Sequence, residues 1–265
     1  MEKTVPPQVD SRVNGRNADF DWDSFDSEAY FAHNYSELRP EDRRIIEIMA
    51  GHFNRIRPRV RNAEAIDVGA GANLYPALAM LPFAGTVTLY ERARSNVRWL
   101  EQERRSPQDS WSRFWSAMSE GNAAYAEVVK PLAALEGQTR VEQGDIFRLP
   151  AGRYDLGTMF FVAESITRTR SEFTRATKSF VDSLRPKAPF AAAFMRESAG
   201  YTVGGHSFPA YAVDEQEVAR LFQKIAHHLE IQVIDSSGLR PGYCGMIVVT
   251  GRAGTTNTTR RGDKR

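Results

Sequence analysis

The sequence has little cysteine and no long apolar run. Its one cysteine, Cys244, excludes an intramolecular disulfide and a cysteine-based zinc site, and we assign no metal ligand. No apolar run approaches the about 20 residues of a membrane helix, and the N-terminus MEKTVPPQVDSR lacks the apolar core of a signal peptide. We therefore expect a soluble, cytoplasmic protein with no membrane partner. Cys244 begins the apolar stretch 244–249, so we expect a buried, inert thiol.

An excess of charge of one sign is also missing. The formal net charge is +2, and Arg and Lys cluster at both termini, so the body of the chain is close to neutral. A nucleic-acid groove would need a basic stripe along one face. We therefore predict no nucleic-acid partner.

What the sequence does have is an alternation of apolar runs and helical patterns. Seven runs are typical of strands, namely 63–70, 86–91, 139–145, 154–163, 189–197, 230–237 and 244–252. Four segments have the spacing of amphipathic helices, namely 40–56, 94–105, 171–184 and 213–229. His227 and His228 are expected to close the last helix. Alternation of this kind predicts an α/β fold with a mainly parallel seven-stranded sheet and helices on both faces. The short connection before the last strand favours an antiparallel hairpin at the edge.

The boundaries follow from composition. We predict a single domain over 20–252, between disordered segments at 1–19 and 253–265. Residues 20–60 form N-terminal helices ahead of the first strand. Residues 106–138 form a helical insertion of one or two helices that carries Trp111, Phe114 and Trp115. For these aromatics, core packing is favoured over a lid or a partner surface.

The stretch AIDVGAGANLY, residues 65–75, places glycines directly after a strand. Gly69 and Gly71 permit a backbone geometry and a close ligand approach that a Cβ would block. Ligands of open parallel sheets bind beyond the carboxyl ends of the strands. Alone, the pattern fits a plain tight turn as well as a ligand site.

Three acids at the ends of successive strands favour the ligand site. Glu91 ends the second strand, where an acid accepts hydrogen bonds from both hydroxyls of a ribose. Asp145 ends the third strand, within reach of an adenine amino group, with Ile146 against the ring. Asp67 precedes the glycines. Together they form a constellation the size of a nucleoside.

The residues after the glycines argue against phosphates. A dinucleotide fingerprint would have a third Gly or Ala where Leu74 stands, followed here by Tyr75 and Pro76. No Lys-Ser/Thr pair follows, so there is no P-loop. A nucleoside without phosphates, such as S-adenosylmethionine, fits better than NAD or ATP.

Six segments carry a resemblance to a known family. They are EAYFAHNYSELRPED, IDVGAGANLYPAL, YERARSNVRWL, GDIFRLP, FFVAESI and RESAGYTVGGHSFPAYAVDEQEV. Across roughly residues 20–250 the chain resembles the class I S-adenosylmethionine-dependent methyltransferases that include nicotinamide, phenylethanolamine and indolethylamine N-methyltransferases. The resemblance implies a Rossmann-like class I methyltransferase fold with an N-terminal helical cap. It also implies S-adenosyl-L-methionine as cofactor and S-adenosyl-L-homocysteine as product.

The resemblance assigns residues to the cofactor. It places Tyr30 and Tyr35 over the methionine part, Gly69, Gly71 and Tyr75 beneath it, Glu91 and Asn96 at the ribose, and Asp145 and Ile146 at the adenine. Asp67 and Phe160 complete the set of candidate cofactor residues. Aromatic faces attract a sulfonium as they attract an ammonium group, although an aromatic stripe on a helix also suits core packing.

The resemblance also assigns a pocket for the methyl acceptor. Its candidate residues are Asn34, Arg39, Glu164, Tyr201 and His206. The candidate catalytic groups are Glu164, which could hold an amine or receive its proton, and His206, which could serve as a base or be a plain surface histidine. The chain departs from its relatives at the end of 189–197, where nicotinamide-type members carry an aspartate and Arg196 or Glu197 stands here. It also departs at GLRPGYCG, which lacks the substrate-binding carboxylate of the phenylethanolamine-type members. We therefore expect a different acceptor.

The function predicted is methyl transfer to a small-molecule acceptor, an amine or heterocyclic nitrogen, with specialised metabolism as the expected setting. Transfer to oxygen or carbon on the same fold stays open. A nicotinamide-dependent oxidoreductase is disfavoured by Leu74 and Tyr75, and a nucleic-acid methyltransferase by FFVAES, which lacks an Asn/Asp-Pro-Pro-aromatic motif. A non-catalytic scaffold that binds the cofactor also stays open. We expect a monomer or a weak homodimer.

Overall fold

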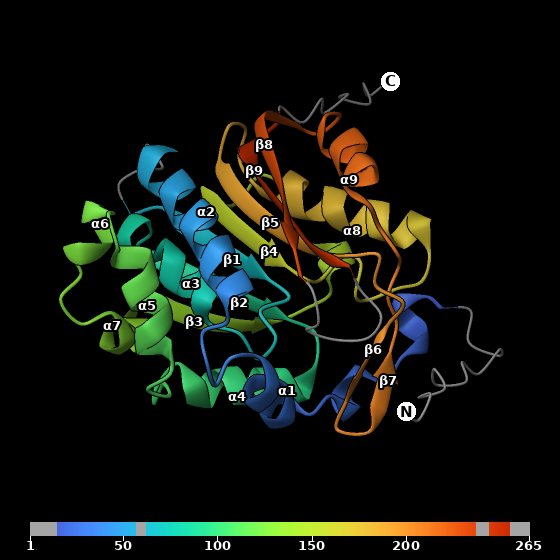
Figure 1. Ribbon diagram of the computed structural model, residues 1–265, viewed down its shortest axis with the longest axis horizontal. Coiled ribbons are helices and arrows are strands. Elements are labelled where there is room, and N and C mark those ends of the chain that lie inside the picture. Colours follow the sequence, from blue (N-terminus) through green and yellow to red (C-terminus); the bar gives the residue numbers. More distant parts are fainter. Residues whose placement is uncertain (1–14, 57–61, 237–243, 255–265) are drawn as a thin grey trace, which may run out of the picture.

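A seven-stranded sheet forms the centre of the protein (Figure 1). The structure, a computed structural model, describes residues 15–56, 62–236 and 244–254. The strands are β1 (Glu64–Val68), β2 (Thr86–Glu91), β3 (Thr139–Gln143), β4 (Leu156–Phe160), β5 (Pro189–Arg196), β8 (Ala226–Asp235) and β9 (Gly245–Ala253). Their order in the sheet is β3-β2-β1-β4-β5-β9-β8. The order reverses between β1 and β4, the place where ligands bind in open α/β sheets.

The strand directions confirm the predicted topology. The neighbouring pairs from β3 to β5 are all parallel. β9 runs antiparallel both to β5 and to β8. The one reversed strand is therefore β9, which lies one position inside the edge strand β8.

Helices cover both faces of the sheet. The helices are α1 (Ser27–Asn34), α2 (Pro40–Ile56), α3 (Tyr75–Met80), α4 (Arg94–Glu103), α5 (Trp111–Ser119), α6 (Ala123–Ala126), α7 (Pro131–Gln138), α8 (Arg170–Ser183) and α9 (Glu215–Phe222). In Figure 1, α2, α3 and α5 lie on one side of the sheet and α8 and α9 on the other.

Alternation along the strands builds two apolar cores. Ala191 and Ala193 of β5 belong to the core with α2, α3 and α5, whereas Phe190, Ala192 and Phe194 belong to the core with α8 and α9. This is the period of two that a strand buried on both faces requires.

The predicted helix 213–229 is wrong in its second half. α9 ends at Phe222, and β8 begins at Ala226. His227 and His228 therefore lie on the edge strand, where His227 pairs with Arg252 and a register shift follows. Pairing with β9 satisfies the backbone of this segment, and this tertiary interaction outweighs the helical pattern.

The insertion 106–138 contains three helices, α5, α6 and α7, where one or two were predicted. Trp111 and Phe114 are fully buried, and Trp115 is nearly so. All three side chains belong to the core on the α2 face. The predicted packing role of these aromatics is confirmed.

The N-terminal boundary of the domain needs correction. Residues 15–19, predicted to be disordered, contain the 3-10 helix η1 (Asn17–Asp19), and Asn17 is buried. A second 3-10 helix, η2 (Trp22–Ser24), follows. Residues 1–14 and 255–265 lie outside the described residues, and Ala253, assigned to the C-terminal tail, is the last residue of β9.

The prediction for Cys244 is wrong. The thiol is exposed, because the residue stands one position before β9 and outside the buried sheet. The pKa of Cys244 is raised by its hydrogen bond with the Glu197 carboxylate. Among the described residues no helix is both long and apolar enough to cross a membrane.

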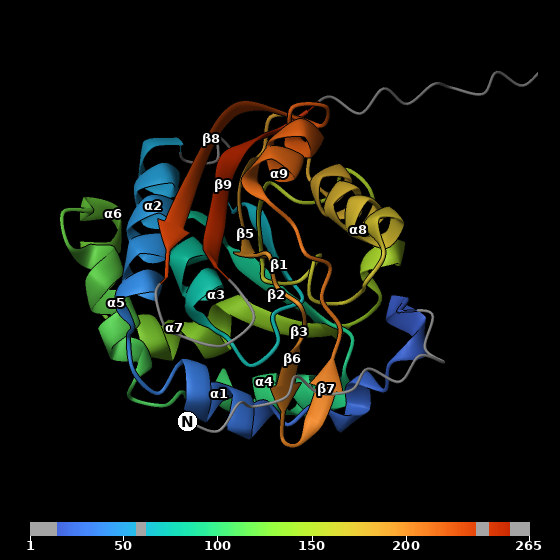
Figure 2. The same ribbon diagram turned by 45° about the vertical axis from the view of Figure 1, so that its right-hand side comes forward.

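A two-stranded hairpin follows β5 at the end of the sheet where α1 and α4 lie (Figure 2). It consists of β6 (Tyr201–Val203) and β7 (His206–Phe208), which were not predicted. Phe208 packs on Trp22 and Phe25, with ring centroids 5.5 and 5.2 Å away. The hairpin is thereby attached to the N-terminal segment.

Alanine substitutions at two glycines provide a test of how tightly the fold is packed. A Cβ on Gly157 in β4 would lie 2.7 Å from Leu184 and 3.1 Å from Phe180, both buried, whereas a Cβ on Gly137 in α7 would meet nothing within 4 Å. We expect Gly157→Ala to lower the free energy of unfolding by about 1–3 kcal/mol through overpacking. Gly137→Ala should raise it by up to about 1 kcal/mol through helix propensity. Urea unfolding measures both, and equal midpoints for the two variants would contradict the packing.

Candidate active site

The glycine turn after β1 rests on the end of β2. Gly69 and Gly71 have φ of 67° and 56°, in the region that favours glycine. The Gly69 N–H donates to the Tyr90 carbonyl at 2.7 Å, and the Gly71 N–H donates to the Glu91 carboxylate at 3.0 Å. A Cβ on Gly69 would lie 2.5 Å from a Val162 methyl. The turn therefore needs glycine at Gly69 for packing as well as for backbone geometry.

The Glu91 carboxylate is the centre of this corner. Its other oxygen accepts the N–H groups of Arg92 and Ala93, each at 2.8 Å. The pKa of Glu91 is raised by burial, which the hydrogen bonds from Ala93, Gly71, Arg92 and the Asn96 side chain oppose. These bonds fix both oxygens between the glycine turn and the start of α4.

Asn96 extends this network to the N-terminal cap. The Ser27 hydroxyl at the start of α1 donates to the Asn96 side-chain oxygen at 2.7 Å, and both residues are buried. Through Asn96, the Glu91 carboxylate is thus connected to α1. Sequence reasoning missed Ser27, because only its position after the capping residue Asp26 marks it locally.

Asp67 is 1% exposed and faces the core behind the turn. One of its oxygens accepts the Thr158 hydroxyl at 2.7 Å, and the other has no hydrogen-bond partner among the described residues. Burial raises the pKa of Asp67 to about 8; the Thr158 hydrogen bond opposes this shift and the Glu91 charge adds to it. The side chain is therefore mainly a neutral acid at pH 7. Its predicted contact with the cofactor stays a prediction.

Asp145 and Ile146 form a second corner at the end of β3. The Asp145 side chain caps the 3-10 helix η4 (Ile146–Arg148) by accepting the Phe147 N–H at 2.9 Å. The Tyr90 hydroxyl donates to the Asp145 carbonyl at 3.2 Å. A Cβ on Gly144 would lie 2.0 Å from that hydroxyl oxygen, so this close approach requires glycine. The ends of β2 and β3 are in this way joined into one wall.

Aromatic rings connect the cap to the sheet. The Tyr35 ring lies 6.0 Å from Tyr30 and 5.8 Å from Tyr75, measured between centroids. Tyr75 meets Phe160 edge-on at 5.7 Å and stacks on Phe114 of the insertion at 5.6 Å. Sequence reasoning assigned the first four rings to the cofactor and treated Phe114 as core. The structure places all five in one continuous set.

Burial keeps these phenols neutral. It raises the pKa of Tyr35 and of Tyr75 well above the ordinary value. The Tyr75 hydroxyl is buried, and an interaction with the Asn73 side chain opposes part of the rise in its pKa. A neutral ring with a polar handle of this kind suits a site that attracts a cation by its aromatic face.

Glu164 lies after β4 and is fully buried. One oxygen accepts the Met195 N–H of β5 at 2.9 Å and the Ser165 hydroxyl at 3.2 Å. The other oxygen has no hydrogen-bond partner in the described parts of the chain. Burial raises the pKa of Glu164 to about 7, against the hydrogen bonds from these neighbours. A buried acid that titrates near neutrality and has an unpaired oxygen is a candidate for proton transfer.

The remaining acceptor candidates lie on the cap and the hairpin. The Asn34 amide donates to the Tyr30 carbonyl at 2.8 Å, and the Arg39 guanidinium donates to the His33 carbonyl, so both close the end of α1. The Tyr201 hydroxyl reaches the Ser165 carbonyl at 3.5 Å, next to Glu164. His206 pairs with Val203 in the hairpin, and the residue is exposed. The structure thus brings Tyr201 next to Glu164, and it places His206 on the exposed strand of the same hairpin.

The chain was also compared with known protein families and structures. A model described as the NNMT/PNMT/TEMT family matches residues 16–238. No curated protein matches the sequence.

Solved structures share the fold at low identity. A SAM-dependent methyltransferase from Methanosarcina mazei is 14% identical, with a TM-score of 0.53 over 82% of this chain and 98% of that chain. The N-methyltransferase NodS from Bradyrhizobium japonicum, in complex with S-adenosylhomocysteine, is 10% identical, with a TM-score of 0.50 over 87% of this chain and 100% of that chain. At such identities these likenesses show the fold alone.

The raised pKa of Asp67 predicts that the free energy of unfolding depends on pH. The folded protein keeps this acid protonated up to about pH 8, whereas the unfolded chain ionises it near 3.8. The unfolded state therefore binds fewer protons between those values, and the contribution of Asp67 to stability falls as pH rises through this window. Asp67→Asn should remove that part of the decline.

Chemical unfolding of both proteins between pH 4 and pH 9 measures the effect. The stability of the wild-type protein relative to Asp67→Asn should fall with rising pH and level off above about pH 8. A difference that does not change with pH would show that the carboxyl ionises normally in the folded protein.

Proposed function

We propose, from the premise that the chain belongs to the NNMT/PNMT/TEMT family, that it methylates a nitrogen atom of a small amine or heterocycle. Membership makes the chain an S-adenosylmethionine-dependent methyltransferase, and the family match covers residues 16–238. The nitrogen acceptor is the part that we propose. The observation that carries it is the buried Glu164 carboxyl with its unpaired oxygen.

The residues at the sheet end fit S-adenosylmethionine, which supplies an activated methyl group when bound. Gly69 and Gly71 adopt backbone geometry that permits a close approach. Glu91 is oriented by four hydrogen bonds at the strand end where a ribose acceptor is expected. We propose that these residues, with Asp145 at the adenine and the rings of Tyr30, Tyr35, Tyr75 and Phe160 at the methionine end, hold the cofactor.

Glu164 has the properties that a nitrogen acceptor requires. An amine attacks only through its free lone pair, so an ammonium group must first lose a proton. An ionised Glu164 would hold the acceptor and take that proton on its unpaired oxygen. Its other oxygen is fixed by the Met195 N–H and the Ser165 hydroxyl, so the side chain needs no reorganisation.

The other candidate residues of the acceptor pocket are proposed to position the acceptor. Met195 is the next-to-last residue of β5, and the hairpin that carries Tyr201 follows this strand. We therefore propose that the segment after β5 forms the acceptor side. We propose that Asn34, Arg39 and Tyr201 line this side, and that the enzyme acts on a small molecule in the cytoplasm as a monomer or weak homodimer. His206, exposed on β7, is the candidate with the least structural support for catalysis.

The proposal is tested in two steps. Calorimetry with S-adenosylmethionine, S-adenosylhomocysteine and NADH should show binding of the two sulfur nucleosides and no binding of NADH. Radiolabelled methyl transfer should then be screened over small amines, nitrogen heterocycles, phenols and carbon acids. Turnover confined to phenols or carbon acids would overturn the nitrogen acceptor and keep the methyltransferase activity.

Glu164→Gln tests the role of the carboxylate. We expect turnover to fall by about 100-fold or more, the usual range for a lost proton acceptor, with the dissociation constant of S-adenosylhomocysteine nearly unchanged. In the wild-type enzyme, turnover should rise as pH passes about 7, because Glu164 ionises there. The variant should lack that rise.

Glu120→Gln is the matched control, since Glu120 is an exposed acid of the insertion that pairs with Arg43 of α2. It should leave turnover and its pH profile unchanged. If Glu164→Gln weakened the binding of S-adenosylhomocysteine more than it lowered turnover, Glu164 would belong to the cofactor site and the proposed role would be wrong.

A further inference from the structure

We propose that Ser27 is a positioning residue of the cofactor site, which acts through Asn96 on the ribose-binding carboxylate of Glu91. This inference rests on the proposed function, because it requires the ribose of an adenosine at Glu91. Ser27 is not among the residues that the sequence assigned to the site. A buried contact between two helices brings it there.

A hydrogen bond enclosed by the protein joins the start of α1 to α4. Ser27 is the first residue of α1, and its hydroxyl donates to the Asn96 side-chain oxygen, Oδ1, at 2.7 Å. Ser27 is 7% exposed and Asn96 is 5% exposed. Because so little of this contact is open to water, a loss of the Ser27 hydroxyl would leave a buried carbonyl oxygen without its donor, which is costly.

The contact with Ser27 decides which end of the Asn96 amide faces Glu91. An asparagine side chain has one acceptor end, Oδ1, and one donor end, Nδ2. With Oδ1 turned to Ser27, Nδ2 is the end that serves Glu91. The hydrogen bond from the Asn96 side chain opposes the rise in the pKa of Glu91, as a bond that stabilises the charged form does. A reversed amide would place two acceptors against each other.

This orientation of Asn96 suits the ribose proposed at Glu91. The other donors to the carboxylate are the backbone N–H groups of Gly71, Arg92 and Ala93, which no side-chain rotation can turn away. A hydroxyl group both donates and accepts hydrogen bonds. A ribose hydroxyl can therefore donate to Glu91 and accept the second N–H of the Asn96 amide, provided that the amide keeps its orientation.

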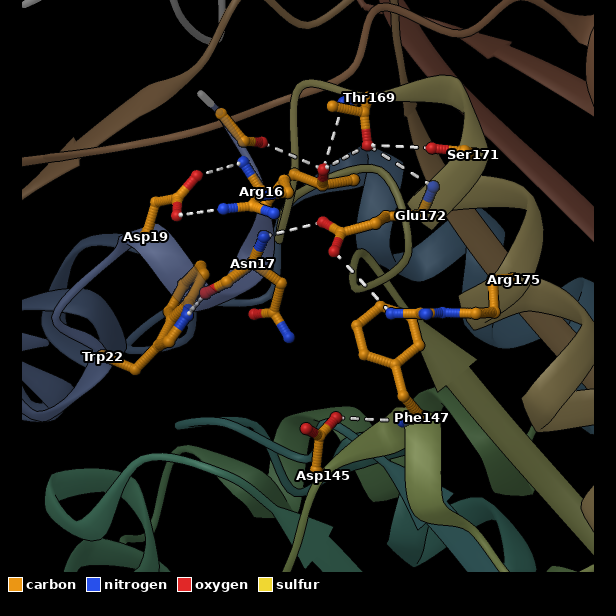
Figure 3. A network of polar contacts seen from close by, with 12 residues as sticks. Arg16, Asn17, Asp19, Trp22, Asp145, Phe147, Thr169, Ser171, Glu172 and Arg175 are labelled. Carbon is orange, nitrogen blue, oxygen red and sulfur yellow. Dashed lines mark hydrogen bonds and ion pairs between the residues drawn. The ribbon is translucent and has the colours of Figure 1, made fainter. Parts of the chain in front are cut away.

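Other contacts of the N-terminal segment hold Ser27 in place. Ahead of α1, the Asn17 N–H donates to the Glu172 carboxylate of α8 at 2.7 Å, as Figure 3 shows. At the start of α1, the Asp26 side chain caps the helix by accepting the Ala29 N–H at 2.9 Å. The position of α1 therefore does not depend on the Ser27 hydroxyl alone, and this hydroxyl can serve to orient Asn96.

A second contact between α1 and α4 does not involve Asn96. The Trp99 indole N–H donates to the Glu28 carboxylate at 3.1 Å, and the Phe31 ring lies 5.6 Å from the Trp99 ring, measured between centroids. Glu28 is exposed and follows Ser27 directly. Removal of its carboxylate loosens α1 on α4 and leaves the hydrogen bond to the Asn96 amide in place. Glu28 thus separates attachment of the helix from orientation of the amide.

The test compares S-adenosylhomocysteine with its 2′,3′-dideoxy analogue, which has no ribose hydroxyls, by calorimetry. The wild-type protein should bind the parent compound at least about tenfold more tightly, because the analogue leaves Glu91 and Asn96 without ribose partners. Ser27→Ala should weaken the binding of the parent compound about tenfold, since the amide must then be turned without its donor when the ribose binds. Binding of the analogue should stay nearly unchanged, so discrimination between the two ligands should shrink.

Glu28→Ala is the matched control on the same helix. Loosening α1 through Glu28 should weaken both ligands by the same factor and preserve the discrimination, because both ligands carry the methionine part that α1 is proposed to cover. If Ser27→Ala weakened both ligands equally as well, Ser27 would act only by attaching the helix, and the inference would be wrong.

A pair of variants with the same shape gives a second comparison. Ser27→Thr keeps a hydroxyl, whereas Ser27→Val has a methyl group in its place. The threonine variant should retain the discrimination between the two ligands, and the valine variant should lose most of it. Equal discrimination by these two variants would overturn the inference even if Ser27→Ala failed to fold.

The background of Asn96→Ala tests whether Ser27 acts through Asn96. In that background Ser27→Ala should reduce the discrimination no further, because the amide that it orients is gone. A further reduction would contradict the proposed route. Equal affinity of the wild-type protein for the two ligands would remove the ribose contact and the role of Ser27, but would leave methyl transfer to nitrogen standing. Failure to bind S-adenosylhomocysteine would overturn the proposed function as well.

Discussion

The hydrogen bonds of the Glu91 carboxylate hold the site together. One side chain at the end of β2 fixes the glycine turn after β1, the first residues of α4 and, through Asn96, the start of α1 at Ser27. These three segments are separated by many residues along the chain. A carboxylate suits this position, because it accepts several N–H groups at once without any donor of its own. The geometry of the turn and the closure of the cap are thus two results of one interaction.

Burial decides the protonation of the neighbouring acids. Asp67 and Glu164 are both enclosed, and each has one oxygen without a hydrogen-bond partner among the described residues. In a low dielectric the charged form is disfavoured, which raises both pKa values. Glu91 is also buried, but it accepts three backbone N–H groups, which oppose the rise in its pKa. Buried acids therefore differ in how strongly the charged form is stabilised, according to the donors around them.

The sequence predicted those parts of the site that depend on local pattern. The glycine turn, the acids at the strand ends and the order of strands and helices all follow from short motifs and periodicity. What it missed depends on pairing between distant residues. Ser27 meets Asn96 across 69 positions, and Asn17 meets Glu172 across 155. No local signal marks such partners, and polar composition even argued for disorder at Asn17. The helix predicted over 226–229 was wrong for a related reason. This segment pairs with β9, and its local helical pattern does not reveal that partner.

The aromatic contact between Phe208 and the rings of Trp22 and Phe25 couples two parts of the enzyme that could have varied separately. The hairpin that carries Phe208 borders the side proposed for the acceptor, while Trp22 also supports Asn17 through its indole N–H. A substitution that reshapes the hairpin therefore disturbs the N-terminal residues 17–25 as well. In evolution, a change in the hairpin would have to keep or rebuild this aromatic contact, because the N-terminal segment packs against the hairpin through it.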